Sequence, residues 1–379
     1  MFGQVPLDFM MLMLLYAVGA TTAAIASIYL FWRRGNAFAP DVTPPTRLRR
    51  WTAIFFACMA LGHLWYLPTA IFTSEEDFLL SNLIGGLLDT MTILPIALVL
   101  LLCMLQDRRR PLWPVIVVIA PAVIIMSISI ANRSYDLVPL VRVYMLLVGI
   151  GIVFYMMYAV WQYGRWLRDN YADLEHKEVW QSVLVLVVIL LVFGIYIGGG
   201  GSDSDMAYEY IVQVCGILLI GYLLWRVETL SELQPLPLSQ SKEPMGSLPE
   251  ESPMSDVPSD VNFEQIESLL QQHCVDTQLY LQHDLTAVQL AQAIGSNRTY
   301  LSKYFARKNT TYNSYINSLR IQHFISLYRE TTEGNRSSAA LKLAGQCGYQ
   351  SYSTFSTAFK QRMHKSVTAW MREEVLTPM

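Results

Sequence analysis

A chain of 379 residues has room for two or three domains, and its composition excludes a single ordinary soluble domain. Hydrophobic residues make up 53% of the chain and charged residues only 15%, whereas soluble proteins carry roughly 25% charged residues. The charge deficit lies before about residue 230, so the net charge of −3 describes neither half of the chain. None of the five cysteines forms a C-x-x-C pair, and we expect no disulfide, no metal and no cofactor.

Long apolar runs dominate the first 230 residues or so. Each has about 18 residues or more, which is enough to cross ~30 Å of hydrocarbon at 1.5 Å per residue. None shows the polar face that a soluble helix of this length would carry. Residues 1–230 are therefore predicted to form a seven-helix transmembrane bundle, a sensor or an anchor. Its spans are expected at residues 9–31, 51–72, 78–105, 112–130, 138–163, 179–198 and 207–226.

The loops between the predicted spans differ in charge from one side to the other. Because basic loops remain on the cytoplasmic side, this difference sets the orientation. One side carries a single basic residue, Arg133, and the other carries eleven. We expect the N-terminus outside and the C-terminus in the cytoplasm, with the chain in a bacterial cytoplasmic (inner) membrane. The eleven residues are Arg33, Arg34, Arg47, Arg49, Arg50, Arg108, Arg109, Arg110, Arg165, Arg168 and Lys177.

Three ionisable residues within the predicted spans form a candidate signal site: His63, Asp89 and Arg142. A charge in lipid is costly, so such groups usually face the bundle interior with a partner. An outward-facing signal pocket is one interpretation. The other is structural pairing, in which Arg142 and Glu209 simply lie at the membrane interface. The spans lack paired aspartates, H-E-x-x-H and G-x-S-x-G, so we expect no enzyme.

The first predicted span carries small residues at four-residue intervals, namely Gly19, Ala23 and Ser27. Small side chains at this spacing let two helices approach closely. We favour packing inside the bundle over a seam between two copies of the chain.

Residues 231–260 are predicted to be a disordered linker. They hold six prolines, seven serines and a net charge of −5, a composition that cannot bury enough apolar surface to fold. A disordered tether cannot transmit a rigid rotation, so the linker can couple the two halves only through proximity. Release by proteolysis within the linker is a further alternative.

A repeat marks residues 261–379. Leu290-Ala291-x-x-x-Gly295 recurs 53 residues later as Leu343-Ala344-x-x-x-Gly348. Each copy is followed by bulky apolar residues at i and i+4, displaced by one position in the second copy. The pattern predicts two helix–glycine turn–helix units, the first opened by a capping box at Thr286. A helix over Tyr312–Tyr328 should link them. With twelve basic and eight acidic residues, this region has a net charge of +4.

These residues resemble an AraC/XylS-type DNA-binding domain over about residues 265–372. The resemblance does not cover the membrane half. Asn309 stands where the family usually has glycine, and His364 and Val367 replace a glycine and a proline before the last helix. The matching positions are Leu285-Thr286, Leu290-Ala291, Gly295, Tyr300-Leu301-Ser302-Lys303, Phe305, Tyr315-Ile316-Asn317, Leu319-Arg320-Ile321, Leu343-Ala344, Gly348-Tyr349, Ser353, Phe355-Ser356, Phe359-Lys360 and Trp370.

The resemblance implies an all-α domain whose two recognition helices enter successive segments of the major groove, about 10 bp apart. Arginine and asparagine can read guanine and adenine edges, while lysines and hydroxyls more often hold phosphates. The expected DNA contacts are Asn297, Arg298, Ser302 and Lys303 in the first unit, and Tyr352, Ser353, Ser356, Thr357 and Lys360 in the second.

The sequence therefore predicts an all-α, membrane-bound, sequence-specific transcription regulator that couples an outside or membrane signal to gene expression. Its expected partners are double-stranded DNA, the lipid bilayer, RNA polymerase and a second copy of the chain, since dimerisation raises the effective concentration of paired DNA-binding domains. The alternative is a membrane receptor or transporter whose C-terminal helical domain binds a protein partner.

Overall fold

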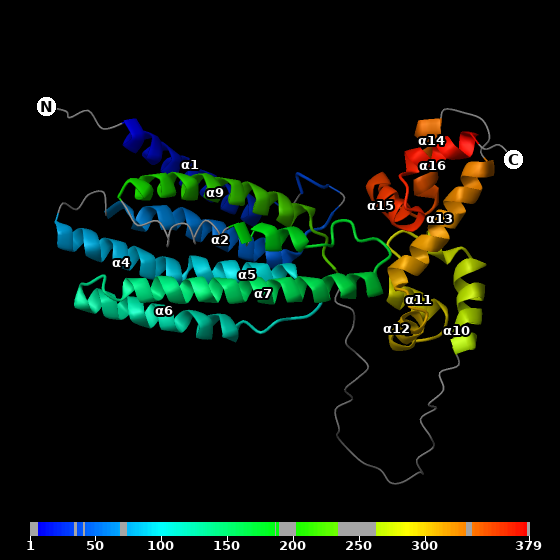
Figure 1. The fold of residues 1–379 in the computed structure, drawn as a ribbon, viewed down its shortest axis with the longest axis horizontal. Coiled ribbons are helices and arrows are strands. Elements are labelled where there is room, and N and C mark those ends of the chain that lie inside the picture. Colours follow the sequence, from blue (N-terminus) through cyan, green and yellow to red (C-terminus); the bar gives the residue numbers. More distant parts are fainter. Residues whose placement is uncertain are drawn as a thin grey trace, which may run out of the picture. The chain divides into compact units, whose positions relative to one another are not determined.

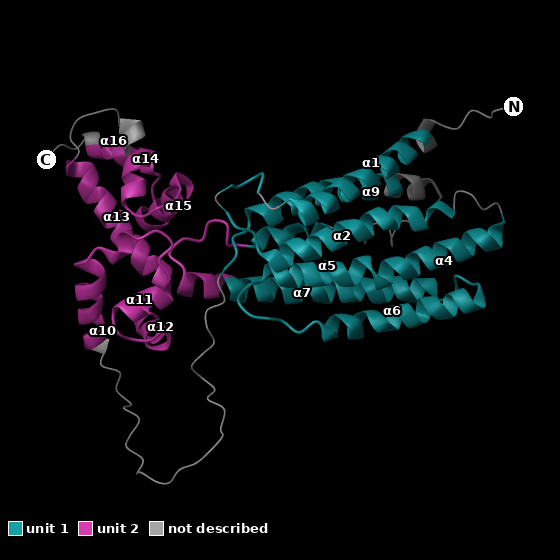
Figure 2. Ribbon diagram, turned by 180° about the vertical axis from the view of Figure 1, so that it is seen from behind, with its two compact units in different colours: residues 1–163, 179–234 teal, residues 164–178, 235–379 magenta. Residues whose placement is uncertain are grey.

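The computed structural model describes residues 7–33, 36–40, 42–68, 74–185, 187–188, 202–233, 263–330 and 336–376. Within these ranges, regular secondary structure is helical apart from one isolated antiparallel bridge between Tyr171 and Thr286. The predicted all-α fold is confirmed. The chain divides into two compact units, residues 1–163 with 179–234 and residues 164–178 with 235–379 (Figure 2). The predicted linker lies outside the described residues apart from positions 231–233.

The first unit contains long apolar helices (Figure 1). Five helical stretches in the described part of the chain are long and apolar enough to cross a bilayer, and they coincide with the first, third, fourth, fifth and seventh predicted spans. The second predicted span lies in α2 only over residues 51–65 and ends outside the described residues, and the sixth falls mostly outside them. The helices are α1 (Leu7–Trp32), α2 (Thr46–Trp65), α4 (Glu75–Met91), α5 (Ile93–Met104), α6 (Trp113–Asn132), α7 (Val138–Asn170) and α9 (Ser202–Thr229).

Large apolar side chains cover the outside of these helices. Leu14 is 65% exposed, Ile116 71% and Phe154 64%, and many similar residues accompany them. An apolar surface of this extent is unfavourable in water but matches the hydrocarbon of a bilayer. The helices are therefore compatible with membrane association.

The third predicted span is a broken helix. It divides at Thr92, with φ −118° and ψ −68°, into α4 and α5. Pro95 lies one turn further on and has no N–H to offer the carbonyl of Met91, so the regular hydrogen-bond ladder cannot continue across this point. The apolar pattern predicted the length of the span but not its division.

The small residues of α1 pack inside the unit, as predicted. Ala23 is fully buried, and the Ser27 hydroxyl donates a 2.8 Å hydrogen bond to the carbonyl of Ala53 in α2. A Cβ added at Gly19 would lie only 3.1 Å from Nε2 of His63. The absence of side-chain bulk on this face is what lets α1 approach α2.

The second unit consists of short helices and two helix-turn-helix pairs, α11–α12 and α14–α15. The Thr286 hydroxyl accepts from the Gln289 N–H while the Gln289 side chain accepts from Thr286, so the predicted capping box is confirmed. The helices are α10 (Phe263–Leu270), α11 (Ala287–Ala293), α12 (Arg298–Arg307), α13 (Tyr312–Glu330), α14 (Arg336–Gln346), α15 (Tyr352–Met363) and α16 (Val367–Leu376), with a π turn at Gln271–Val275 and a 3₁₀ turn at Leu279–Leu281.

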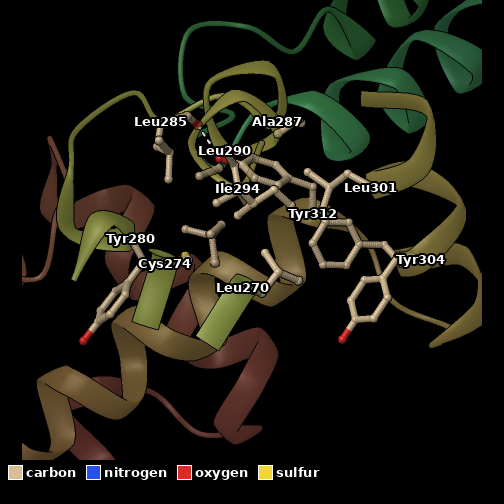
Figure 3. Close-up of a cluster of buried hydrophobic side chains, with 14 of the residues drawn as sticks. Leu270, Cys274, Tyr280, Leu285, Ala287, Leu290, Ile294, Leu301, Tyr304 and Tyr312 are labelled. Atoms are coloured by element: carbon tan, nitrogen blue, oxygen red, sulfur yellow. Dashed lines mark hydrogen bonds between the residues drawn. The ribbon is translucent and has the colours of Figure 1, made fainter. Parts of the chain in front are cut away.

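Helix α13 contributes to two hydrophobic cores. Ile316, near its start, is buried in a core with α10, α11 and α12 (Figure 3). Phe324, two turns later, is buried with Phe355 and Phe359 of α15. Each helix-turn-helix pair thus has its own hydrophobic core, and α13 contributes side chains to both cores.

A buried arginine lies between the two cores. Arg320 is fully buried, donates hydrogen bonds to the carbonyls of Tyr280 (2.7 Å) and Gln282 (2.8 Å), and lies 5.3 Å from the centroid of the Tyr349 ring. Burial lowers the pKa of this guanidinium, and its bonds to carbonyl oxygens offset the loss of water. Arg320 therefore serves the fold and is not available to bind DNA.

Candidate nucleic-acid interface

The two turns use glycine in the left-handed region, with φ +65° at Gly295 and φ +85° at Gly348. The first turn reaches its N-cap, Asn297, two residues after the glycine, whereas the second reaches Ser351 after three. This extra residue explains the displacement by one that the repeat shows. The surroundings also differ, because a Cβ at Gly348 would lie 2.6 Å from the carbonyl oxygen of Leu281 while Gly295 faces open space.

The first recognition helix, α12, buries one face and exposes the other. Leu301, Tyr304 and Phe305 lie in the core, so Ser302 and Lys303 point to solvent. The side-chain oxygen of Asn297 accepts a 3.0 Å hydrogen bond from the Tyr300 N–H, and this oxygen caps the helix. The exposed face holds an open hollow of about 280 Å³ lined by Arg298, Thr299, Ser302 and Lys303.

The second recognition helix, α15, places Ser353, Thr357 and Lys360 on one exposed face, at i, i+4 and i+7. Ser356 is half-buried beside this face. Tyr352 differs from the other predicted contacts, since its ring packs 5.7 Å from that of Phe355 at the edge of the second core. Much of the Tyr352 side chain is therefore used for packing.

The departures from the family pattern keep the required backbone shape. Asn309 and His364 adopt φ +51° and φ +57°, the left-handed conformation that glycine would supply. Val367 begins α16 and is 1% exposed in the second core. The last turn is thus formed without the usual glycine and proline.

The cysteines of this unit are structural. Cys274 and Cys347 are fully buried, and burial raises the pKa of their thiols to about 11 and about 12. Both thiols stay protonated near neutral pH and pack as small apolar groups.

The candidate signal residues lie in the first unit. Asp89 accepts hydrogen bonds from Trp65 (3.1 Å) and Tyr66 (2.8 Å), and His63 lies within electrostatic range of it. Arg142 is exposed on α7. His63 and Asp89 thus lie near each other, and the signal site of all three residues stays a prediction.

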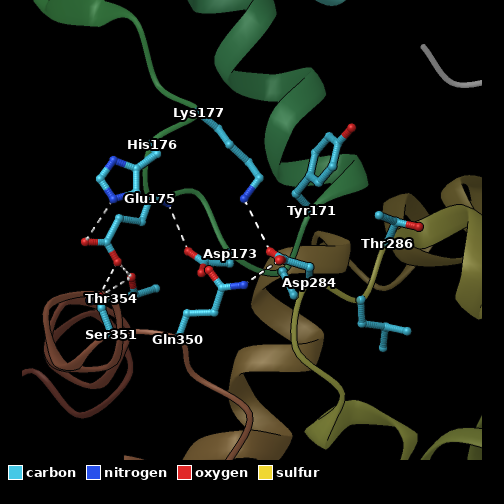
Figure 4. Close-up of polar contacts among 12 residues, drawn as sticks. Tyr171, Asp173, Glu175, His176, Lys177, Asp284, Thr286, Gln350, Ser351 and Thr354 are labelled. Atoms are coloured by element: carbon cyan, nitrogen blue, oxygen red, sulfur yellow. Dashed lines mark hydrogen bonds and ion pairs between the residues drawn. The ribbon is translucent and has the colours of Figure 1, made fainter. Parts of the chain in front are cut away.

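Several residues at the recognition helices were not among the predicted contacts. Thr299 lines the hollow on α12, and Ser351 caps α15 by accepting from the Thr354 N–H at 3.2 Å. The repeat could have identified Ser351, because it occupies the position of Asn297. No local pattern pointed to Glu175, whose carboxylate accepts hydrogen bonds from the hydroxyls of Ser351 and Thr354 (Figure 4).

Residues 171–177, which we call the docking segment, carry Glu175 and follow directly on α7. The structure groups this segment with the C-terminal domain, although the predicted domain boundary placed it in the membrane half. A segment from far upstream in the sequence therefore belongs to the same compact unit as the recognition helices.

The comparison with known families agrees with this architecture. A family model described as a helix-turn-helix domain matches residues 290–373, a range that begins within α11 and includes α12, α13 and the α14–α15 pair. This match points to a DNA-binding transcription regulator and covers well under half of the chain. No curated protein and no solved structure matches the chain significantly.

Proposed function

We propose that the protein is a membrane-bound, sequence-specific DNA-binding transcription regulator. The observation that carries the proposal is the pair of helix-turn-helix units, each with a buried apolar face and an exposed polar one, packed on a shared helix. This arrangement offers two helices of one domain to successive segments of a major groove.

The exposed faces suggest a division of labour. Arg298 and Lys303 make α12 the cationic helix, and Arg298 is suited to reading a guanine edge in bidentate fashion. Ser353, Thr357 and Lys360 make α15 a mostly hydroxyl-bearing helix, suited to phosphates and mixed base contacts. Asn297 and Tyr352 contribute less than the sequence predicted, since one caps its helix and the other packs on the core.

The membrane half would hold this domain beneath the cytoplasmic membrane and receive the signal. The cluster around Asp89 and His63 is the candidate sensor, because polar groups inside apolar helices are costly and tend to be functional. Dimerisation of the bundle and contact with RNA polymerase are further expectations of this proposal.

Selection of DNA by the full-length protein tests the function. The protein in lipid nanodiscs is incubated with a randomised duplex pool, and enriched sequences are footprinted. We expect site-specific protection that Arg298→Ala and Lys303→Ala weaken. The matched control is Lys308→Ala, which removes the same charge from a lysine paired with Glu267 at 2.9 Å. Enrichment of no sequence by any form would contradict the proposal and favour the receptor or transporter with a protein partner.

A further inference from the structure

The docking segment is held on the DNA-binding domain by its backbone. The Asn313 side chain of α13 donates hydrogen bonds to the carbonyls of Tyr171 (3.1 Å) and Ala172 (2.6 Å), and Asn317 donates to Ala172 at 3.1 Å. Ala172 is 2% exposed and belongs to the first hydrophobic core. Two side-chain amides, one helical turn apart, thus donate hydrogen bonds to backbone carbonyls of this segment. Such paired, buried hydrogen bonds are typical of a specific intramolecular binding site.

Charged side chains extend the contact toward both helix-turn-helix pairs. Lys177 is 8% exposed and lies 3.6 Å from Asp284, just before α11. Asp284 in turn accepts a hydrogen bond from Gln350, in the turn before α15. Through Lys177 and Asp284, the segment is therefore connected to the residues just before α11 and just before α15. It also contacts α13, the helix between the two pairs.

Glu175 occupies the N-terminus of α15. Ser351 and Thr354 donate their hydroxyls to one of its carboxylate oxygens, and Ser351 is also the cap of the helix. The N-terminus of a helix carries a partial positive charge and attracts an anion. A recognition helix approaches DNA with these same N-terminal groups, where a phosphate or a base edge would meet them.

Arg298, the first residue of α12, lies within electrostatic range of an acidic and an aromatic residue of the same stretch. The charges of Arg165, Arg168 and, more weakly, Arg298 act on Asp169, at the end of α7. Burial raises the pKa of the Tyr171 phenol, and the charge of Arg298 opposes that rise. The residue best suited to read guanine thus lies within the field of the stretch that leads into the docking segment.

We propose that residues 171–177 are an intramolecular inhibitor whose Glu175 carboxylate takes the place of a DNA phosphate at the start of α15. Docking and DNA binding then exclude each other, because a carboxylate left at this position would repel the backbone of the duplex. The fraction of undocked protein sets the apparent affinity for DNA. Since the segment is covalently continuous with α7, a change in that helix can alter docking without passing through the linker. This inference rests on the proposed DNA-binding function.

A charge-neutral, shape-preserving variant tests the inference. Full-length Glu175→Gln in nanodiscs is titrated by fluorescence anisotropy with duplexes that it or the wild type enriches from a randomised pool. We expect its affinity to exceed that of the wild type by about tenfold, because a charge-assisted hydrogen-bond pair is lost. The matched control is Glu178→Gln, which removes the same charge from an exposed residue three positions on and should change affinity far less.

The outcomes separate this inference from the proposed function. Site-specific binding by the wild type, with Glu175→Gln no tighter than Glu178→Gln, overturns the inhibitor and leaves the DNA-binding function intact. Enrichment of no duplex by any of the three forms overturns both.

Hydrogen exchange gives a readout that does not depend on affinity. The amides of residues 171–177 should be protected in the free protein and should exchange faster when the selected duplex is added. Unchanged protection in the DNA complex would overturn the proposal, since the segment would then stay docked while DNA is bound.

Discussion

The two helix-turn-helix pairs share one motif, yet they are placed in different surroundings. The first pair turns at Gly295 in open space and presents a cationic helix. The second turns at Gly348 against the backbone of Leu281, and the start of its recognition helix is occupied by Glu175. The turn of the first pair is thus unobstructed and its recognition helix is cationic. The turn of the second pair is tightly packed, and Glu175 covers the start of its recognition helix. The two copies of the motif share one backbone shape, but the residues packed around each copy determine whether the start of its recognition helix is exposed or covered.

The largest effect should come from the tighter turn. Gly348→Ala combines a left-handed φ with a backbone clash, so we expect the second pair to lose about 3–5 kcal/mol of stability. Gly295→Ala should cost about 1–2 kcal/mol, from φ alone. Alkylation of buried Cys347 reports the second core, and that of Cys274 reports the first.

Gly345→Ala is the control for this comparison, since it lies within α14 with open space around it and should not destabilise the fold. Equal alkylation rates for the Gly348 and Gly295 variants would contradict the difference between the two turns.

The next largest effect should come from Arg320 in α13, the helix that contributes to both cores. Arg320→Leu leaves the carbonyls of Tyr280 and Gln282 without their donor, at an expected cost of about 3 kcal/mol. Because α13 serves both cores, alkylation of Cys274 and Cys347 should accelerate together. Arg329→Leu, at a partly exposed ion pair with Glu374, is the control and should leave both rates nearly unchanged. Acceleration at one cysteine alone would show that the cores do not depend jointly on Arg320.

Arg298 and Tyr352 hold equivalent positions, the first residue of each recognition helix. Arg298→Ala should weaken binding of a selected duplex by about 1–3 kcal/mol without loss of stability. Tyr352→Ala should instead lower the stability of the second core, because its ring packs against Phe355. Anisotropy titrations and cysteine alkylation on the same samples distinguish the two effects. A loss of affinity at Tyr352 that matches the loss at Arg298, with Cys347 still protected, would refute this assignment.

The smallest effects should come from the left-handed residues that close the recognition helices. His364→Gly relieves a side chain held at φ +57° and should stabilise the second pair by about 0.5–1 kcal/mol. Asn309→Gly should gain less, because asparagine already tolerates this conformation. Slower Cys347 alkylation in His364→Gly, with Cys274 unchanged in rate, is the expected result; faster alkylation would mean that the histidine side chain stabilises the turn.

Much of the fold follows from short-range patterns. Five of the seven predicted spans coincide with described helical stretches that are long and apolar enough to span a bilayer. The spacing of Leu290, Gly295, Leu343 and Gly348 predicted both helix-turn-helix pairs. The capping box at Thr286 needed only four consecutive residues. The exposed faces of α12 and α15 also followed, because a helix that buries every third or fourth residue must present the others.

The rest depended on contacts between residues far apart in the chain. Glu175 meets Ser351 across 176 positions, and Arg320 meets Tyr280 across 40, and neither pair leaves a periodic trace. The same reason explains Tyr352, whose equivalence to Arg298 gave no hint that its ring would pack on the second core.

The sequence by itself determined that this chain joins apolar, membrane-length helices to a repeated helix-turn-helix motif, because both features are encoded within a few helical turns. The tertiary structure alone decided what covers the motif. Helix α13 offers Asn313 and Asn317 at one place on its surface, and only the packing of α13 against its neighbours brings the chain at Ala172 to them. The position of Glu175 at the start of α15 follows from that packing.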